Sequence, residues 1–448
     1  MPGSEKLVRI EPPEFVSVVV ERLRLKGYEV YIVGGAVRDA ILGRNHQDWD
    51  LTTNASAPDI HRIFSDIGHY QLKHDTVTLV RSHQKIEVTP YRAEQGADLR
   101  RDLALRDFTI NAMAYCPSRG HLIDYFGGLE DLRRKKIRAV GNPLDRFKED
   151  PLRLIRAIRI AVELGLQIEP STWHVLKDMA PLISDCAMER IREELIKILL
   201  IQKPSTGFSM LRRAGLLGHI IPELLEGYLK RQNRYHRYTI FKHTMVTMDS
   251  VPPMLLLRLV ALLHDIAKPR VRVKESGRWR FIGHEHESAK LAQDIMHRLR
   301  FSSSLIHRVA HLVRHHMINY SPQWNDAALR RWARKVGIDN VHILTTFRKA
   351  DLIAHGTDIA AADLRLLGQF EQRIEEILRR ENTVTSSSDL SINGRDVMKI
   401  LGIAPGPRVG KILEELMELV TENPELNTRE HLVDILRKDP RFVGPGAQ

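Results

Sequence analysis

The sequence predicts a mixed α/β (α+β) head followed by a long all-α body, and three observations support this fold class. Segments rich in β-formers alternate with helical ones only as far as about Ile137. Beyond that point the strand signals stop, and apolar residues recur with helical spacing. With 448 residues the chain is also too long for one ordinary core, so roughly two to four domains are expected.

The elements of the head follow from apolar periodicity and from glycine breaks. The β-rich run Glu29–Val33 leads directly into Gly34 and Gly35, and a short helix follows. Two later β-rich segments flank the polar turn RSHQ and are typical of a hairpin. In chain order we expect a helix over 14–25, a strand over 29–33, a helix over 36–42, a strand over 48–52, a helix over 57–65 and hairpin strands over 76–80 and 85–89.

The rest of the chain is predicted to be helical. Helical spacing is clear over 151–164, 171–179, 187–200 and 206–214. From about residue 235 it continues to the end, interrupted by polar or Pro/Gly breaks at KESGRW, SPQWN, TVTSSSD and APGPR. We expect domain boundaries that divide the chain into residues 1–137, 138–234, 235–357 and 358–448.

Composition and charge indicate the cellular setting and the kind of partner. No apolar run is long enough to span a bilayer, and Cys116 and Cys186 are too few for a disulfide framework, so a cytoplasmic protein is expected. The formal net charge is +12, from 68 Lys and Arg against 56 Asp and Glu. Such a surplus favours a polyanionic partner, although a basic but unspecialised surface is the alternative.

Paired aspartates in the head are typical of metal-dependent phosphoryl transfer. Asp48 and Asp50 lie two residues apart on a predicted strand, so their carboxylates face the same side. Glu87, in the hairpin strand IEV, is positioned to supply a third carboxylate from a neighbouring strand. Two acidic groups side by side require a cation between them, and Mg²⁺ suits all-oxygen ligands. Taken alone, D-x-D is also common in solvated turns.

The glycines before this pair indicate a phosphate-binding junction. Gly34 and Gly35 lie where a strand meets a helix, so the backbone there is able to approach a triphosphate closely. Arg38, in the first turn of that helix, is placed to add a charged contact to the phosphates.

The segment Glu149 to Arg153 has two interpretations. Asp150 followed by Pro151 is a common way to start a helix. Alternatively, Asp150 accepts and Arg153 donates hydrogen bonds from one helical face, which matches the donor–acceptor edge shared by cytosine and adenine. Uracil and guanine would leave such groups unpaired, at a cost of about 1–3 kcal/mol each.

A second set of residues indicates a metal site in the helical part. His264-Asp265 ends an apolar helix, and a doublet there is able to supply two ligands to one metal. With 21 histidines, however, some proximity arises by chance, and we expect His286, His311 and His315 to be bystanders. The candidate partners of the doublet are His243, His284, His316 and Asp351.

Five ordered motifs resemble the bacterial tRNA nucleotidyltransferase family, which includes CCA-adding, CC-adding and A-adding enzymes and poly(A) polymerases. These motifs are VGGAVRDAILG, DWDLTT, ALRDFTINAMA, IDYFGGLEDL and RFKEDPLRLIRAIRIA, within residues 28–200. The resemblance implies a polymerase-β-like head, with Asp48 and Asp50 as Mg²⁺ ligands and with E-D-x-x-R reading CTP and ATP without a nucleic-acid template. It also implies that Arg106 and Asp107 recognise the ribose as a buried charge pair, although Leu105 departs from the arginine often found there.

The helical metal residues resemble an HD phosphohydrolase domain of the H…HD…D type. This implies a site for Ni²⁺, Co²⁺, Mn²⁺ or Mg²⁺ with phosphatase or 2′,3′-cyclic phosphodiesterase activity, or a decayed scaffold that binds metal without turnover. The four regions then become a nucleotidyltransferase head, a nucleotide-reading neck and body, an HD domain and a tRNA-binding tail.

A short connection in the head favours a CC-adding enzyme. Only Ala93–Arg101 (AEQGADLRR) separates Tyr91-Arg92 from Asp102, whereas CCA-adding relatives have a long flexible loop there. Within the family, loss of that loop is associated with enzymes that stop after CC. Full CCA addition is the alternative.

Basic residues suggest where tRNA lies. Arg153, Arg156 and Arg159 follow one helical face, either as a phosphate or nucleotide track or as a solvated basic surface. The competing functions are a poly(A) polymerase and an HD phosphohydrolase whose head only binds RNA. The sequence does not specify the oligomeric state.

Overall fold

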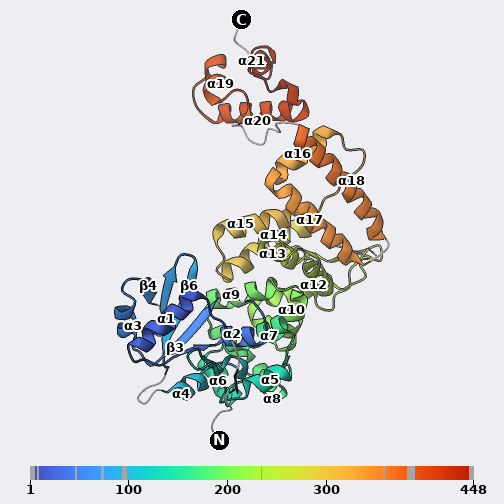
Figure 1. The fold of residues 1–448 in the computed structure, drawn as a ribbon. Coiled ribbons are helices and arrows are strands. Elements are labelled where there is room, and N and C mark those ends of the chain that lie inside the picture. The colour runs from blue at the N-terminus through green and yellow to red at the C-terminus, as the bar shows by residue number, and fades with distance from the viewer. Residues whose placement is uncertain are drawn as a thin grey trace. The chain divides into compact units, whose positions relative to one another are not determined.

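The protein divides into two compact units. The computed structural model describes residues 6–7, 10–45, 48–71, 75–92, 98–233, 235–356, 359–380 and 389–442 (Figure 1). Unit 1 comprises Met1–Ile201 and Thr206–Ile220, and unit 2 comprises Gln202–Ser205 and Ile221–Gln448. The finer boundaries at residues 138, 235 and 358 stay a prediction.

Unit 1 contains an eight-stranded mixed sheet. The strand order is β1-β8-β7-β2-β3-β6-β5-β4, and every pairing is antiparallel except that of β3 with β6. Helices α1 and α3 contact each other, and each also contacts strands of the sheet (Figure 1). The elements are β1 (Lys6–Leu7), α1 (Glu14–Leu25), β2 (Val30–Val33), α2 (Gly35–Ile41), β3 (Trp49–Thr53), α3 (Ala57–Ile63), β4 (Gly68–Gln71), β5 (Val77–Arg81), β6 (Gln84–Pro90), β7 (Ala114–Cys116) and β8 (His121–Ile123).

The register of three strands brings the acidic residues of the head together. The parallel pairing of β3 with β6 sets Asp50 opposite Glu87. On the other side of β3, the antiparallel pairing with β2 sets Asp50 opposite Val33, the last residue before Gly34. The hairpin expected over 76–89 is therefore confirmed as β5–β6, and it delivers Glu87 to the strand that bears Asp50.

The remainder of unit 1 is helical, as the sequence predicts, with one addition. The short strands β9 (Lys136–Ile137) and β10 (Gln167–Ile168) form a parallel pair. Two-residue strands are too short to show a period-two pattern, so sequence reasoning missed this pair. The helices are α4 (Leu99–Ala104), α5 (Gly128–Arg133), α6 (Pro143–Glu149), α7 (Arg153–Leu164), α8 (Pro170–Asp178), α9 (Met188–Leu199), α10 (Pro204–Arg213) and α11 (Leu216–Ile220).

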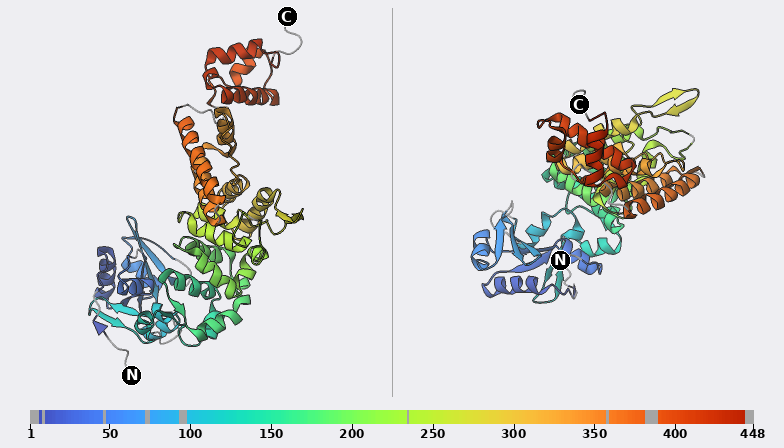
Figure 2. Two further views of the ribbon diagram at one scale, coloured as in Figure 1. Left: turned by 90° about the vertical axis from the view of Figure 1, so that its right-hand side faces the viewer. Right: turned by 90° about the horizontal axis from the view of Figure 1, so that it is seen from above.

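Unit 2 is a helical array with one hairpin. The segment KESGRW, expected as an irregular break, lies in the antiparallel hairpin of β11 (Val273–Glu275) and β12 (Arg278–Arg280), which projects from the helices (Figure 2). Its strands are mostly exposed and polar, so no apolar alternation marks them. The helices are α12 (Ile240–Ser250), α13 (Leu255–Leu263), α14 (His284–Arg298), α15 (Ser303–Arg314), α16 (Asp326–Val336), α17 (Ile338–His355), α18 (Ile359–Arg380), α19 (Gly394–Leu401), α20 (Pro407–Glu422) and α21 (Arg429–Lys438).

The last three helices have an apolar core of their own. Val397, Leu416 and Leu432, one from each helix, are fully buried in it. A capping box between Asn393 and Asp396 starts α19. Among the described helices, none is both long enough and apolar enough to cross a membrane.

Candidate active sites: a carboxylate pocket and a histidine–aspartate cluster

A polar pocket of about 280 Å³ opens beside the sheet of unit 1. It gathers most of the predicted head residues from the strands, from the loop after α4 and from the start of α7. Its lining consists of Gly34, Gly35, Asp50, Leu51, Glu87, Thr89, Arg92, Arg106, Asp107, Asn111, Asp150, Arg153 and Arg156. Of the predicted head residues, Asp48, Arg38 and Arg159 do not line it.

Asp50 and Glu87 form the acidic wall of this pocket. Asp50 is half-buried, while Asp48, just before β3, and Glu87 are exposed. Burial raises the pKa of Asp50, the Arg106 guanidinium opposes that rise, and the Asp48 charge adds to it. Partial burial, together with the charges of Asp50 and Asp48, likewise raises the pKa of Glu87. Carboxylates that repel one another in this way fit a divalent cation.

Gly34 is required by the close approach of the backbone to Asp50. Its φ of 75° belongs to the region that side chains rarely adopt. A Cβ added there would lie 2.9 Å from Oδ2 of Asp50 and 3.1 Å from Nη1 of Arg106. Arg38 is buried instead of facing the pocket, because its guanidinium donates to Asn111 and to Asp39.

The prediction that Arg106 and Asp107 pair with each other is wrong. Arg106 lies 3.6 Å from the buried Asp102, whereas Oδ2 of Asp107 lies 2.8 Å from Nη2 of Arg156. Burial opposes ionisation of Asp107, but Arg156 and hydrogen bonds from Asn111 and the Phe108 amide outweigh it and lower the pKa of the Asp107 carboxyl. Both residues still line the pocket, each held by a different partner.

Asp150 and Arg153 also line the pocket, but not as two residues of one helix. Asp150 precedes α7; its Oδ1 accepts from the Leu152 amide, and both of its oxygens accept from Arg190. Arg153 donates to Glu149 and to the carbonyl of Leu105. The local turn at Asp150 resembles the cap that the sequence suggested, although the helix itself starts at Arg153.

Arg159 is engaged elsewhere. Its guanidinium donates to Glu163 and Glu194, on the same helix and on α9.

Sequence reasoning missed Arg92 and Asn111 in the lining of this pocket, and Asp102, which lies 3.6 Å from the lining residue Arg106. Asp102 is buried and accepts from the Thr52 hydroxyl and the Arg92 amide. Asn111 links Arg38 to Asp107. Asn111 stands inside the motif ALRDFTINAMA, so that motif was the available signal. The short connection before Asp102 is helical from Leu99, where α4 begins, and residues 93–97 lie outside the described residues.

The six metal residues predicted in the helical region converge in unit 2. All are nearly or fully buried, and they come from helices α12, α14 and α17, from the end of α13 and from the segment after α15. They are His243, His264, Asp265, His284, His316 and Asp351.

Asp265 stands at the centre of this cluster, with histidines on both sides. Its Oδ2 lies 3.5 Å from Nε2 of His243 and 3.2 Å from Nε2 of His264. Its Oδ1 lies 3.4 Å from Nε2 of His284 and 4.0 Å from Nε2 of His316. Two groups of ligand atoms therefore meet at one carboxylate: His243–His264–Asp265 and Asp265–His284–His316.

The donor set of the cluster fits divalent metal. Neither oxygen of Asp265 accepts a hydrogen bond within the described structure, nor does Nε2 of His284 form one, although the Lys268 ammonium lies 2.6 Å from Oδ2 of Asp265. Buried polar atoms without such partners are costly unless an ion engages them. Burial favours neutral His264, but Asp265 and Asp351 outweigh it and raise the pKa of His264 to about 9.

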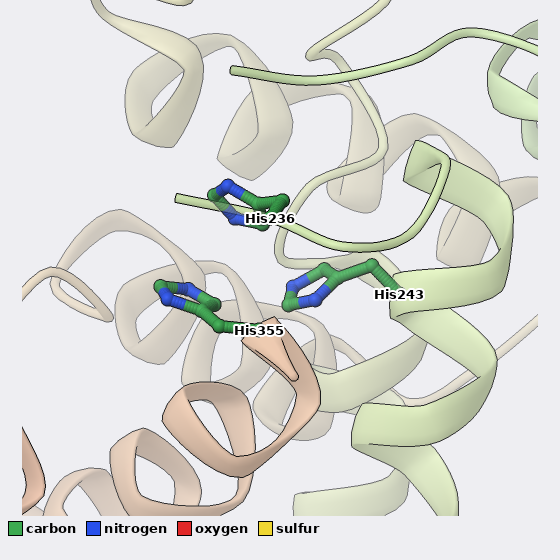
Figure 3. A group of neighbouring side chains, drawn as sticks. All are labelled: His236, His243 and His355. Carbon is green, nitrogen blue, oxygen red and sulfur yellow. The ribbon is translucent and has the colours of Figure 1, made fainter. Parts of the chain in front are cut away.

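Four further residues at this cluster were not predicted. Figure 3 shows His236, His243 and His355 with their rings gathered together, from the segment before α12, from α12 and from the end of α17. Lys268 and Arg348 hold the two carboxylates: Lys268 contacts Asp265, and Arg348 donates to Oδ2 of Asp351. His355 lies four residues after Asp351, and Arg348 lies three residues before it. Residues at these spacings share one face of a helix, so the sequence contained a signal for both.

A cavity of about 320 Å³ opens onto the cluster. Besides Asp265, His284, His316 and Asp351, its walls include the cations Lys268 and Arg348. A buried carboxylate–imidazole set next to cations is an arrangement suited to a phosphate-containing ligand.

The polymerase-β-like sheet, with its carboxylate pocket, places the chain in the class of nucleotidyltransferases, and comparisons with known proteins agree. Three family models match: the poly A polymerase head domain over residues 30–138, the probable RNA and SrmB-binding site of polymerase A over 165–227, and the putative tRNA nucleotidyltransferase domain 2 over 274–436. The chain belongs to the bacterial tRNA nucleotidyltransferase and poly(A) polymerase family.

Relatives along most of the chain bear three different names. The A-adding tRNA nucleotidyltransferase of Deinococcus radiodurans is 31% identical, with 86% of this chain and 90% of the relative covered. The CC-adding tRNA nucleotidyltransferase of Thermus thermophilus is 30% identical, with 90% and 92% covered. The CCA-adding enzyme of Enterococcus faecalis is 28% identical, with 95% and 97% covered.

A solved structure shares the overall fold. The Bacillus stearothermophilus CCA-adding enzyme in complex with CTP has a TM-score of 0.74 and 25% identity, and the match covers 96% of this chain and 98% of that one. The predicted fold class, a polymerase-β-like head followed by a helical body, is thereby confirmed.

Proposed function

We propose that this protein extends the 3′ end of tRNA with cytidine from CTP, using Mg²⁺ held by Asp48, Asp50 and Glu87. The observation that carries the proposal is the register of β2, β3 and β6. It sets the Asp50 and Glu87 carboxylates side by side and next to the glycine turn of Gly34. When bound there, Mg²⁺ supplies charge neutralisation for phosphoryl transfer.

The other pocket residues then have separate tasks. Gly34 and Gly35 leave room for the triphosphate, and Arg106 and Asp107 orient the ribose. Asp150 and Arg153 read the base edge shared by cytosine and adenine.

Arg190 is a positioning residue for this reading edge. It holds both oxygens of Asp150 at 3.1 and 2.9 Å and so fixes the direction in which the carboxylate presents its remaining lone pairs.

Addition of two C residues is favoured over full CCA addition because the connection between Arg92 and Asp102 is short. A switch from cytosine to the larger adenine requires a lever that reshapes the pocket, and a long flexible loop supplies one. The relatives include CC-adding, CCA-adding and A-adding enzymes, so tRNA nucleotidyltransferase is the shared part of the proposal. Poly(A) polymerase is the less favoured alternative.

One assay separates these activities. The protein is incubated with Mg²⁺, tRNA lacking its last three nucleotides, and labelled CTP or ATP, separately and together. Two C additions without A support the CC-adding proposal, and CCA addition supports the alternative. No addition of C, or long A tails, would contradict both.

We also propose that the histidine–aspartate cluster is a divalent-metal phosphohydrolase site, with Ni²⁺, Co²⁺, Mn²⁺ or Mg²⁺ as candidate ions. The supporting observation is Asp265, whose two oxygens each face a separate pair of histidines. The test is metal-dependent hydrolysis of a 2′,3′-cyclic phosphate at an RNA end. The activity should vanish in Asp265→Asn and persist in Asp50→Asn; hydrolysis by Asp265→Asn at the wild-type rate would refute the site.

The setting proposed for both activities is the cytoplasm. Cys116 and Cys186 are both free thiols, which supports a reducing compartment.

A further inference from the structure

A third cavity, of about 500 Å³, lies in unit 2 and is not used by either proposed activity. It is formed by the start of α14, the end of α15, the segment that follows α15, and α16. Its lining consists of Glu285, His286, His311, Arg314, His315, Met317, Asn319, Trp324, Trp332 and Lys335. We call it the Trp–Arg pocket.

The pocket contains two cations that no acidic side chain in the described part of the chain pairs with. Arg314 and Lys335 are exposed, and neither forms an ion pair or a side-chain hydrogen bond with any described residue. The one acidic residue in the lining, Glu285, lies 3.4 and 3.8 Å from the imidazole nitrogens of His284 and His286. An anionic ligand therefore meets two charges whose pairing is not already satisfied.

Aromatic surfaces accompany these cations. Trp332 is held by an edge-on contact with Phe370, with ring centroids 4.8 Å apart, and Trp324 by a similar contact with Tyr320 at 5.8 Å. Both tryptophans are half-buried and line the cavity, so each is fixed while part of it stays accessible. Rigid aromatic side chains beside unpaired cations are the combination that binds a base and its phosphate.

The histidines of the pocket do not make it a metal site. His311 forms a hydrogen bond to the carbonyl of Val336 through Nε2 and contacts the His315 ring edge-on. Among the described residues, the metal-compatible groups involve other histidines, and none includes His286, His311 or His315.

The Trp–Arg pocket adjoins the histidine–aspartate cluster. Met317 lines both this pocket and the cavity above the cluster. Glu285 and His315 in the pocket are also the chain neighbours of the cluster residues His284 and His316. A strand with one nucleotide in the pocket would therefore pass Met317 to reach the cluster.

We propose that the Trp–Arg pocket binds one nucleotide of an RNA strand, with its base against Trp324 or Trp332 and its phosphate between Arg314 and Lys335. This inference rests on the proposed function, because it takes RNA to be the polyanion that this chain handles. The pocket then makes the phosphohydrolase site selective for a phosphate within or at the end of an RNA chain. A free mononucleotide would lack the neighbouring phosphates that both cavities accommodate.

The test is RNA affinity measured by fluorescence anisotropy on the full chain, at several salt concentrations. The probes are tRNA lacking its last three nucleotides and a labelled single-stranded RNA of about ten nucleotides, which is within the length that such surfaces bind. The double variant Arg314→Gln/Lys335→Gln removes two exposed charges. The matched control Arg308→Gln/Lys349→Gln removes two exposed charges of unit 2 that lie outside the pocket.

We expect the pocket variant to bind the short RNA about tenfold more weakly. The slope of log affinity against log salt should fall by about 0.7, the value for one lost single-strand phosphate contact. The control double variant should match the wild type, and Trp324→Leu should weaken binding about fivefold or more. Equal affinity and slope in the pocket and control variants would overturn the proposal.

Two further measurements keep this result separate from the proposed function. In the first, CMP and AMP compete with the RNA probe. Displacement by either at concentrations near the RNA dissociation constant would overturn an RNA-strand site in favour of a mononucleotide site.

In the second, CTP incorporation is measured for the wild type and the pocket variant at saturating tRNA. An unchanged maximal rate in the pocket variant supports a role outside the head. If the wild type does not incorporate CTP but the Arg314→Gln/Lys335→Gln variant still binds RNA more weakly than the wild type, the nucleotidyltransferase proposal is refuted and the RNA-binding proposal for the pocket is supported.

Discussion

The carboxylate pocket of unit 1 and the histidine–aspartate cluster of unit 2 are assembled in opposite ways. The pocket places Asp50 and Glu87 on adjacent strands, with oxygen ligands only, and Glu87 is exposed. The cluster draws nitrogen and oxygen ligands from helices far apart in the sequence, and its central residue, Asp265, is fully buried. The carboxylates of the first site are half-buried or exposed, whereas those of the second are buried beneath a cavity that opens onto them.

This difference indicates how each site would hold a metal ion under the proposed function. An open pair of carboxylates suits an Mg²⁺ ion that keeps several waters and arrives with substrate phosphates. A buried imidazole–carboxylate set suits an ion that stays with the protein and contributes to its stability. Changes at the head should therefore alter catalysis more than folding, and changes at the cluster should alter metal content first.

After substitution of Asp50 itself, the largest effect is expected from Glu87→Gln. Removing one carboxylate of the pair should lower the rate of nucleotide addition about a hundredfold or more, because bound metal contributes several kcal/mol to phosphoryl transfer. Single-turnover incorporation of labelled CTP measures this effect. Glu14→Gln, an exposed glutamate on α1, is the control, and a rate for Glu87→Gln equal to that of the control would remove Glu87 from the site.

Asp265→Asn should lower the affinity of unit 2 for its metal about a hundredfold. The carboxylate faces histidines on both sides, so its loss weakens both groups of ligands. Metal content after dialysis, measured by mass spectrometry, reports the change, and head activity should stay within about twofold of the wild type. Retention of the full metal complement would show that Asp265 is not a shared ligand.

Arg156→Gln should cost about 2 kcal/mol of unfolding free energy, because it leaves the Asp107 carboxylate buried without its counter-ion. This cost is lower than for a fully buried ion pair, because the Arg156 side chain is partly exposed and solvent screens its charge. Since the folded-state pKa of Asp107 lies below its unfolded value, the ion pair stabilises the protein above about pH 4 and that contribution fades on acidification. Urea unfolding at two pH values checks both points; a gap between wild type and variant that widens on acidification would contradict the pairing.

Gly34→Ala is expected to have the smallest of these effects. Comparison with a second glycine separates the backbone strain of a positive φ from displacement of the Asp50 side chain. Both Gly34 and Gly43 have positive φ, so alanine at either position should cost about 1 kcal/mol of stability. Only at Gly34 would the new Cβ meet Asp50, at 2.9 Å from Oδ2, while nothing lies within 4 Å at Gly43. Nucleotide addition should therefore fall about tenfold more for Gly34→Ala than for Gly43→Ala. Equal rates would show that the Gly34–Asp50 approach has no part in catalysis.

Sequence reasoning placed the local features well. The hairpin of residues 76–89 put Glu87 on the correct strand, because alternation of period two fixes which face a residue occupies. The doublet His264-Asp265 and its partners also converge as expected, since the end of an apolar helix is necessarily held in the core. The hairpin and the doublet were each recognised from a pattern within a few residues, whereas the partners of the doublet lie far apart in the sequence.

Contacts between residues far apart in the sequence could not be predicted from local patterns. The partners of Asp107 and Asp150 are Arg156 and Arg190, and no local spacing distinguishes these arginines from the other basic residues nearby. His236 was missed for the same reason, because it reaches the cluster from an irregular segment before α12 (Figure 3). The Trp–Arg pocket arises where separate helices meet, so its members carried no common signal in the sequence.

The most direct measurement is the rate at which Asp50→Asn adds cytidine to truncated tRNA in the presence of Mg²⁺, with metal content of unit 2 recorded on the same sample. The account predicts a loss of about a thousandfold or more in rate with unchanged metal content, because Asp50 serves only the open pocket. Addition at the wild-type rate would contradict the assignment of Asp50 as the anchor of the transferring metal.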